Sequence, residues 1–140
     1  MQEMISNNHE ELNQSLIIET LNLTGDILSD IIHQINETTE FDPERSVLLN
    51  QRLISLTSSI TQFIELSTLL SRALTKKFGK ILPDIKNSHI HLLFVLKGIV
   101  QANGKLDFIV LEDLIKHELK DNLTQWKINY LPNLKKSLNL

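Results

Sequence analysis

Histidine is the side chain of this sequence best suited to chemistry at neutral pH, and the five histidines form no recognised motif. His89 and His91 are two residues apart near the start of a predicted helix, and that spacing points them in different directions. The segments Asp30–His33 and Asp113–His117 have spacings that could place two ligands on one helix face. A di-iron helical bundle needs two Glu-x-x-His motifs, and the sequence contains none. We therefore predict no metal and no cofactor, and interpret the histidines as surface or core-end residues.

Two further kinds of catalytic site are also poorly supported. Helical phosphotransfer domains carry an exposed histidine followed three and four residues later by Lys and Gly. Lys97 and Gly98 match this pattern, but the accepting position holds Phe94, and His91 lies too far from Lys97. Nucleophilic catalysis lacks a cysteine and a Gly-x-Ser-x-Gly turn. We expect a protein that is not an enzyme, and keep a phosphotransfer or metal-binding bundle only as an alternative.

Composition indicates a single globular domain spanning residues 1–140. The sequence is 41% hydrophobic and 22% charged, with a net charge of −3, which argues against a nucleic-acid partner. It has no cysteine, and its first residues do not read as a secretory signal, so we expect a cytoplasmic protein. The longest apolar run, Ile90–Val100, is too short and too polar to span a bilayer.

One long predicted helix, residues 43–78, organises the chain. Asp42 is a good N-cap, Pro43 suits the first helical position, and Gly79 suits the left-handed position beyond the end. Within the helix, apolar residues recur in alternating steps of four and three, with one polar member. This row comprises Leu49, Leu53, Leu56, Ile60, Phe63, Ser67, Leu70 and Leu74. Such a row is typical of the buried seam of a helical bundle.

Three other helices are predicted at about residues 9–36, 88–103 and 108–131, with frayed ends at 1–8 and 133–140 and a loop from Lys80 to Asn87. The third is apolar on almost all sides, so we expect it to be the most buried. On the fourth, Glu112 and Lys116 are expected to pair on the outer face. Few Gly and Pro and short connections predict an all-α fold, an antiparallel four-helix bundle of the up-down-up-down kind.

The face opposite the seam of helix 43–78 is polar but poor in charge. Between Arg52 and Arg72 the only charged residue is Glu65, whereas an ordinary solvated helix face carries interspersed Lys and Glu. The low charge fits a polar face that is exposed to solvent, and it also fits a face that is covered by a partner or by a second copy. The candidate partner-binding residues are Gln51, Ser55, Ser58, Gln62, Glu65, Leu69 and Arg72.

The C-terminal half shows a family resemblance, carried by Phe94, Lys97, Gly98, Ala102, residues 111–114, Glu118, Leu119, Leu123 and Trp126. Over about residues 90–130 it is similar to a hairpin of small all-helical bacterial proteins, among them FliS-like flagellar export chaperones and their co-chaperones. Those proteins bind an exported subunit by laying a helical segment of it against the bundle. The resemblance implies a bundle that binds protein, and it transfers no binding residue to this chain.

Together these observations predict a non-enzymatic protein–protein interaction module, such as a chaperone or adaptor of the flagellar or secretion type. The alternative is a homodimeric structural or regulatory protein that associates through its helix faces. A wide apolar face on helix 9–36, with Leu16 and Leu23 among its residues, favours deep burial in the bundle or burial against another chain.

Overall fold

The computed structural model describes the backbone of residues 2–79 and 83–138, and the side chains of residues 14–77 and 85–138. Three helices are α1 (Gln2–Glu37), α2 (Ser46–Phe78), which a 3₁₀ turn η1 (Pro43–Arg45) precedes, and α3 (Pro83–Gly104). A fourth helical run comprises α4 (Phe108–Asp113), η2 (Leu114–Leu119), α5 (Lys120–Gln125), η3 (Trp126–Tyr130) and α6 (Leu131–Ser137). No strand occurs within those backbone ranges, so the predicted all-α class with four long helices is confirmed.

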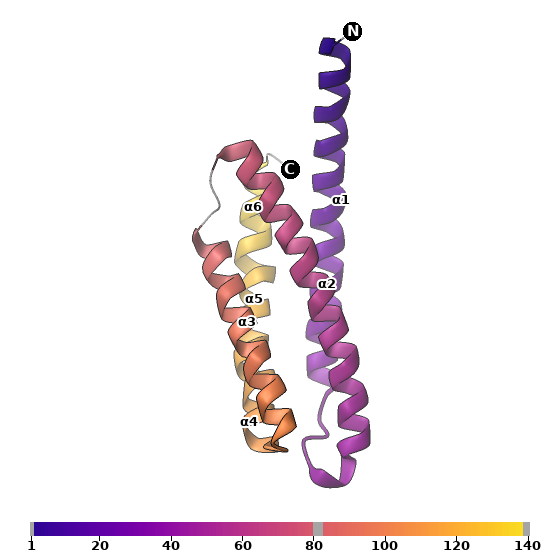
Figure 1. Ribbon diagram of the computed structural model, residues 1–140, viewed down its shortest axis with the longest axis vertical. Coiled ribbons are helices and arrows are strands. Elements are labelled where there is room, and N and C mark those ends of the chain that lie inside the picture. Colours follow the sequence, from indigo (N-terminus) through magenta and orange to yellow (C-terminus); the bar gives the residue numbers. More distant parts are fainter. Residues whose placement is uncertain (1, 80–82, 139–140) are drawn as a thin grey trace.

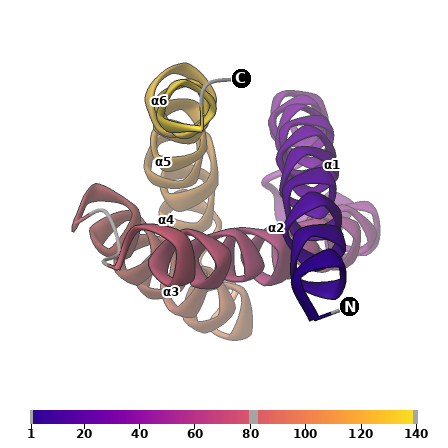
Figure 2. The same cartoon turned by 90° about the horizontal axis from the view of Figure 1, so that it is seen from above.

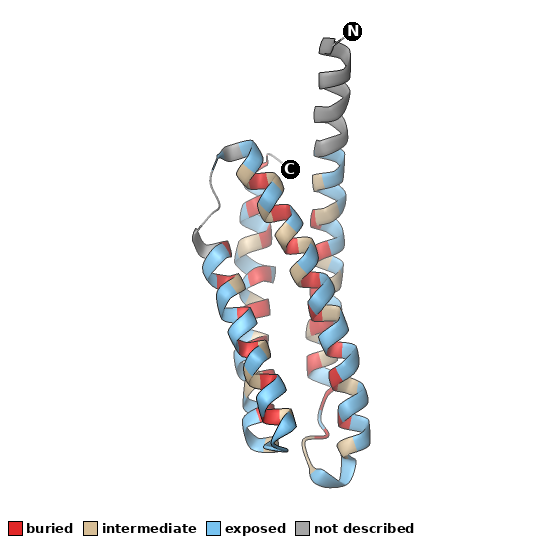
Figure 3. Cartoon of the chain, viewed as in Figure 1, coloured by how far each residue is buried: buried red, intermediate tan, exposed pale blue. Residues whose placement is uncertain are grey.

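Consecutive helices run in opposite directions along the long axis of the molecule (Figure 1). α1 and α2 form one hairpin, and α3 and the C-terminal helix form the other. Seen from above, α2 leans across the molecule while α1 and the C-terminal helix stand nearly parallel (Figure 2). The buried residues face the space that the helices enclose, and the exposed residues face outward (Figure 3).

The predicted limits and seam of the central helix are confirmed. The Asp42 carboxylate accepts a hydrogen bond from the backbone N–H of Arg45 at 3.1 Å. At the other end, Gly79 adopts a left-handed φ of 78° and its N–H donates to the carbonyl of Thr75 at 2.7 Å. All eight members of the seam are buried, including Ser67 at 1% exposure. Local end signals and a regular apolar period therefore sufficed to define α2.

Three other helix limits differ from the prediction. α1 begins at Gln2 rather than near residue 9, because no Gly or Pro interrupts the sequence between them. α3 begins at Pro83, so the predicted loop to Asn87 is wrong over residues 83–87, while Lys80, Ile81 and Leu82 lie outside the described residues. Proline fits the first turn of a helix, where no hydrogen bond to its missing N–H is needed. Ile85 is buried and anchors this start.

The C-terminal helix continues past Pro132 to Ser137, so the predicted end at residue 131 and the frayed segment from residue 133 are wrong. A π-helical turn, η3, comes just before, and the N–H of Leu131 donates to the carbonyl of Trp126, five residues back. Pro132 then lies in the first turn of a new α segment, where proline is tolerated. Leu134 and Leu138 are buried and hold this extension against the core.

π-helical turns also explain how the C-terminal helix keeps its apolar row inward. Leu111, Ile115, Leu119 and Leu123 are spaced four residues apart, and each is 0% exposed. In a regular α-helix a step of four residues overshoots a turn, so the row would rotate by about 40° at each step. The π-helical segment η2 from Leu114 to Leu119 has wider turns, which offset this rotation. The row therefore stays on one face.

α3 is not the most buried helix, contrary to the prediction. Ile90, Phe94 and Val100 are 57%, 76% and 69% exposed. Its opposite face, with Leu92 and Val95, is buried against the rest of the molecule. A helix that is apolar on all sides need not be covered on all sides, and composition alone does not show which side is covered.

Lys116 joins the two hairpins. The sequence predicted that Lys116 would lie on a solvated outer face, and this prediction is wrong. Its ammonium donates to the backbone carbonyls of Ile35 and Asn36 in the last turn of α1. Those carbonyls lie in the last turn, at the negative end of the helix dipole, and that of Ile35 also accepts from the backbone N–H of Thr38 at 3.2 Å. Burial lowers the pKa of Lys116, the nearby Lys120 lowers it further, and the acidic groups around it raise it.

Lys116→Met keeps most of the side-chain stem but removes the charge that caps α1. We expect a loss of about 1 kcal/mol of unfolding free energy, the usual contribution of a charged hydrogen bond at a helix end. Urea unfolding monitored by circular dichroism measures it. Lys127→Met, an exposed lysine of the same helix, is the control and should stay close to the parent. Equal stability of the two variants would contradict the capping role.

Candidate functional site

All seven candidate partner-binding residues on α2 are exposed. One of them, Ser55, donates to the side-chain oxygen of Gln34 in α1 at 3.3 Å, and the Gln34 amide donates to Ser59 at 3.0 Å. Ser55 thus lies at the edge of the face and helps to join α1 to α2. Sequence reasoning missed Val47 and Ile54, which are 73% and 71% exposed on the same side of the helix. Their three- and four-residue spacing from Gln51 and Ser58 was the available signal.

We call this surface the outer face of α2. It comprises Val47, Gln51, Ile54, Ser55, Ser58, Thr61, Gln62, Glu65, Leu69 and Arg72. Much of it follows steps of four and three, which is the spacing by which one helix packs on another. Ser58 and Thr61 are small and would allow close approach of a second helix. It is therefore shaped like a helix-docking surface, although its centre is polar.

Two leucines of α1 form a second exposed apolar surface. The start of this helix extends well beyond the other helices (Figure 1). Leu16 and Leu23 are 57% and 50% exposed, whereas Ile31 and Ile35, further along the same helix, are fully buried. The wide apolar face predicted for this helix is therefore covered only in part, since Leu21 and Leu28 are also buried. Gly25 is not required for close packing, because a methyl group there would meet only Leu131 at 4.0 Å.

A third group of exposed apolar side chains lies on the hairpin formed by α3 and α4. Its members are Ile90, Leu93, Phe94, Val100, Leu106, Ile109 and Val110. On the inner side of this hairpin, a methyl group on Gly98 would approach Leu114 to 3.2 Å. Gly98, part of the Lys-Gly pair that resembled a phosphotransfer motif, therefore has a packing role between α3 and η2.

The single tryptophan is a core residue where three helices meet. Trp126 is 1% exposed, and its indole makes an edge contact with Phe63 of α2 at a centroid distance of 5.2 Å. It stacks with His89 of α3 at 5.3 Å and meets Tyr130 edge-on at 5.4 Å. His89 in turn is hydrogen-bonded through Nε2 to the hydroxyl of Ser67, at 2.8 Å. The one polar member of the α2 seam is thus paired with a histidine.

Burial lowers the pKa of His89, because the imidazolium would lose its hydration inside the cluster. The folded protein therefore holds His89 neutral at a pH where the unfolded chain, with an ordinary pKa near 6.5, already binds a proton. The unfolded state binds more protons below that pH, so stability must fall as the pH drops through 6.5 toward the lower, folded-state pKa of His89.

We expect His89→Gln to reduce the loss of stability between neutral and mildly acidic pH. A glutamine amide can reach the position of Nε2 and keep the bond to Ser67, yet it does not titrate. Urea midpoints across this pH range measure the effect. His33→Gln, at an exposed histidine of α1, is the matched control and should retain the parental slope. An unchanged slope in His89→Gln would show that another group causes the pH dependence.

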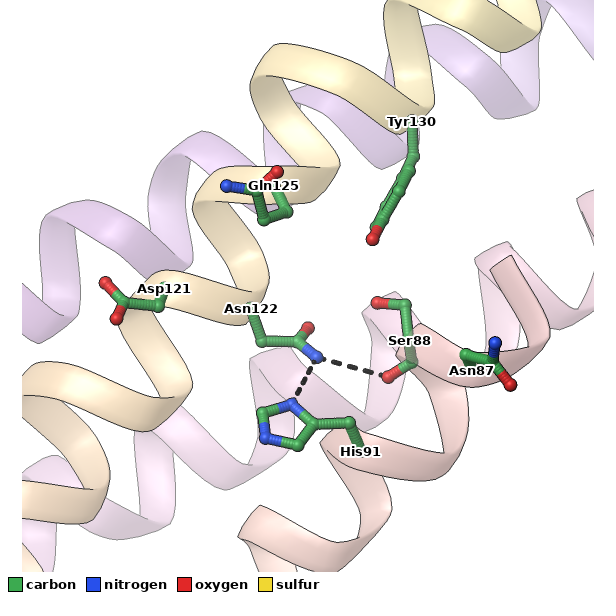
Figure 4. A pocket seen from close by; sticks show the side chains of 7 residues that line it. All are labelled: Asn87, Ser88, His91, Asp121, Asn122, Gln125 and Tyr130. Carbon is green, nitrogen blue, oxygen red and sulfur yellow. Dashed lines mark hydrogen bonds between the residues drawn. The ribbon is translucent and has the colours of Figure 1, made fainter. Parts of the chain in front are cut away.

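The second histidine of the pair belongs to a polar site between α3 and α5. The amide nitrogen of Asn122 donates to the backbone carbonyl of Ser88 at 3.1 Å and meets Nδ1 of His91 at 3.0 Å (Figure 4). The other ring nitrogen of His91 lies 3.4 Å from a carboxylate oxygen of Glu118. His89 and His91 therefore point to different neighbours, as their spacing predicted.

A cavity of about 310 Å³ opens beside this amide. Its lining residues are Asn87, Ser88, His91, Asp121, Asn122, Gln125 and Tyr130. Ser88 and Asn122 are 6% and 7% exposed, and the hydroxyl of the first and the amide oxygen of the second have no hydrogen-bond partner. Sequence reasoning missed both residues, since a serine and an asparagine in amphipathic helices carry no motif.

No metal-binding group emerges where the sequence spacings had suggested a possible pair. Among the described residues, no three His, Asp or Glu side chains are close enough together to hold a metal ion. His33 lies 3.9 Å from Glu37 on the surface of α1, and Asp113 and His117 are exposed on the C-terminal helix.

In comparisons with known proteins, no family model, no curated protein and no solved structure matches the chain. The structure adds one observation on α2. By length and composition alone, Pro43–Lys77 could cross a membrane, a test that the core helices of soluble proteins also pass. The seam of this helix, from Leu49 to Leu74, lies in the protein core.

Proposed function

We propose that this protein is a non-enzymatic, cytoplasmic protein–protein interaction module, and that the outer face of α2 receives a helix of its partner. In this proposal the four helices form an antiparallel up-down-up-down bundle, and the outer face of α2 lies on the outside of that bundle. The resemblance of residues 90–130 to FliS-like export chaperones gives the class of role: a chaperone or adaptor that holds a helical segment of a client protein.

The observation that carries the proposal is the combination of exposure and low charge on the outer face of α2. Between Arg52 and Arg72 only Glu65 is charged, and yet the whole face is open to solvent. Protein interfaces are depleted in charge at their centre, whereas free surfaces are rich in Lys and Glu. Ile54 and Leu69 supply exposed apolar area that an amphipathic partner helix would bury.

Site-specific photo-crosslinking in the producing cell tests this proposal. A photo-reactive residue at Ser58 or Gln62 should give discrete protein adducts of one mass. The same residue at Glu112 or Lys127, both exposed on the C-terminal helix, should give none. Leu69→Glu combined with the probe at Ser58 should abolish the adduct, because a charge would be buried in the interface.

The fold must survive for this test to be informative. Leu69 is 54% exposed, so Leu69→Glu should change the unfolding free energy by no more than about 0.5 kcal/mol. Adducts that form equally from α2 and from the C-terminal helix, or from neither, would contradict a binding face on α2.

A second candidate function, a homodimeric structural or regulatory protein, is favoured by α1. The start of this helix extends beyond the other helices (Figure 1), and Leu16 and Leu23, further along it, are exposed. Isolated helices of this length are marginal in water, so a second copy packed alongside would stabilise the extended part. The two helices could then bury their apolar rows against each other.

Sedimentation at micromolar concentration distinguishes this second candidate. A dimer of the parent protein should become a monomer in the double variant Leu16→Glu/Leu23→Glu, because charges would face each other across the helix pair. Leu106→Glu, an exposed leucine between α3 and α4, is the control and should remain dimeric. A monomeric parent protein would rule out the homodimer.

A further inference from the structure

The residues that line the cavity between α3 and α5 present several oxygen atoms and include no lysine or arginine. We propose that it is a binding site for the primary ammonium group of a small organic amine. One buried amide has a fixed orientation, two hydroxyl groups face it, and the charged residues around the cavity are acidic.

The orientation of the Asn122 amide is fixed by its neighbours. Its nitrogen has two hydrogens, and the carbonyl of Ser88 and Nδ1 of His91 can accept one each. The reverse orientation would place the amide oxygen against the Ser88 carbonyl oxygen, two acceptors with no hydrogen between them. His91 therefore accepts at Nδ1 and carries its proton on Nε2, toward Glu118. The amide oxygen of Asn122 is left without a protein donor.

Two hydroxyl groups face this oxygen from other turns of the structure. In Figure 4 the Ser88 hydroxyl from α3 and the Tyr130 hydroxyl from η3 point into the space beside the Asn122 oxygen. The Ser88 hydroxyl is buried without a partner, as is the amide oxygen. An unpaired buried polar group costs free energy, and two at one place indicate a site that is completed by a bound molecule.

The geometry selects a hydrogen-bond donor with several hydrogens. An amide oxygen can only accept, and a hydroxyl oxygen can also accept, so the site offers three acceptors to one group. A primary ammonium carries three N–H donors, whereas a water molecule has two. The cavity, at about 310 Å³, is large enough for a small organic molecule attached to that group.

The charges near the cavity also favour a cation. No lysine or arginine is among the lining residues, and Asp121 is the one acidic residue among them. Its carboxylate points away from the centre in Figure 4, so it acts through its field at the rim rather than by direct contact. Glu118, with a carboxylate oxygen 3.4 Å from Nε2 of His91, adds a second negative charge near the cavity. An anionic ligand would meet no compensating charge here.

The test is a titration of the full-length protein with butylamine, which is an ammonium ion at neutral pH. Side-chain amide signals of Asn87, Asn122 and Gln125 in ¹H–¹⁵N spectra should shift with saturation. Fluorescence of Trp126, which contacts Tyr130, gives a second readout. Butyltrimethylammonium has the same charge but no N–H donor, butanol has no charge, and butyrate is an anion. None of these three compounds should cause a saturable change in these signals.

Two variants connect the binding to the oxygens without removing the amide. Ser88→Ala and Tyr130→Phe should each weaken butylamine binding about tenfold, the effect of losing one hydrogen bond to a charged group. Ser88→Ala removes an unpaired buried hydroxyl, so it should melt at the same temperature as the parent or higher. Ser58→Ala, a serine exposed on α2, is the matched control and should bind as the parent does.

The possible outcomes separate clearly. Saturable shifts with butylamine alone, with the affinity reduced about tenfold in Ser88→Ala and in Tyr130→Phe, support the proposal. Equal binding of butyltrimethylammonium or butanol would overturn it, because N–H donation would then not decide the affinity. The proposal would also be overturned by binding of butyrate, by unchanged binding in folded Ser88→Ala, or by the absence of any shift. The absence of any shift would mean that the cavity binds only water.

Discussion

The contact on which this structure most depends is the aromatic cluster around Trp126. The indole lies between Phe63 of α2 and His89 of α3, so one residue of the C-terminal helix contacts both α2 and α3. The hydrogen bond between His89 and Ser67 fixes the height of α3 along α2. A buried polar pair is satisfied only in one register, whereas leucine contacts tolerate a shift of one turn. The aromatic cluster therefore stabilises the fold, and the hydrogen-bonded pair specifies one register of α3 against α2.

Sequence analysis predicted α2 well because its signals are local. An Asp-Pro start, a terminal Gly and a period of apolar residues act within a few residues of the positions that they define. The two errors at prolines arose because proline can start a helix as well as end one. Pro83 is a start, and Pro132 is accommodated after the π turn η3, which no propensity in the sequence announces. Composition also could not show which side of α3 would be covered.

The residues that sequence analysis missed act over long separations. Lys116 caps a helix that ends about eighty residues earlier, and Asn122 holds the carbonyl of Ser88. In the sequence each of them stands in an ordinary amphipathic pattern, where a lysine or an asparagine is read as solvent-facing. Their roles depend on which helices become neighbours. The exposed face of α2 was the opposite case, because low charge is visible in the sequence itself.

The π turns connect the architecture of the C-terminal helix to its polar site. The first of them, η2, keeps the row from Leu111 to Leu123 inward although its members are four residues apart. In α5, Asn122 and Leu123 are adjacent residues and both are buried. A regular α-helix separates adjacent side chains by about 100°. Covering both therefore requires two contact surfaces: Leu123 packs in the apolar core, and the amide of Asn122 faces α3. The same geometry that packs the core thus places a polar group where only α3 and a bound molecule can satisfy it.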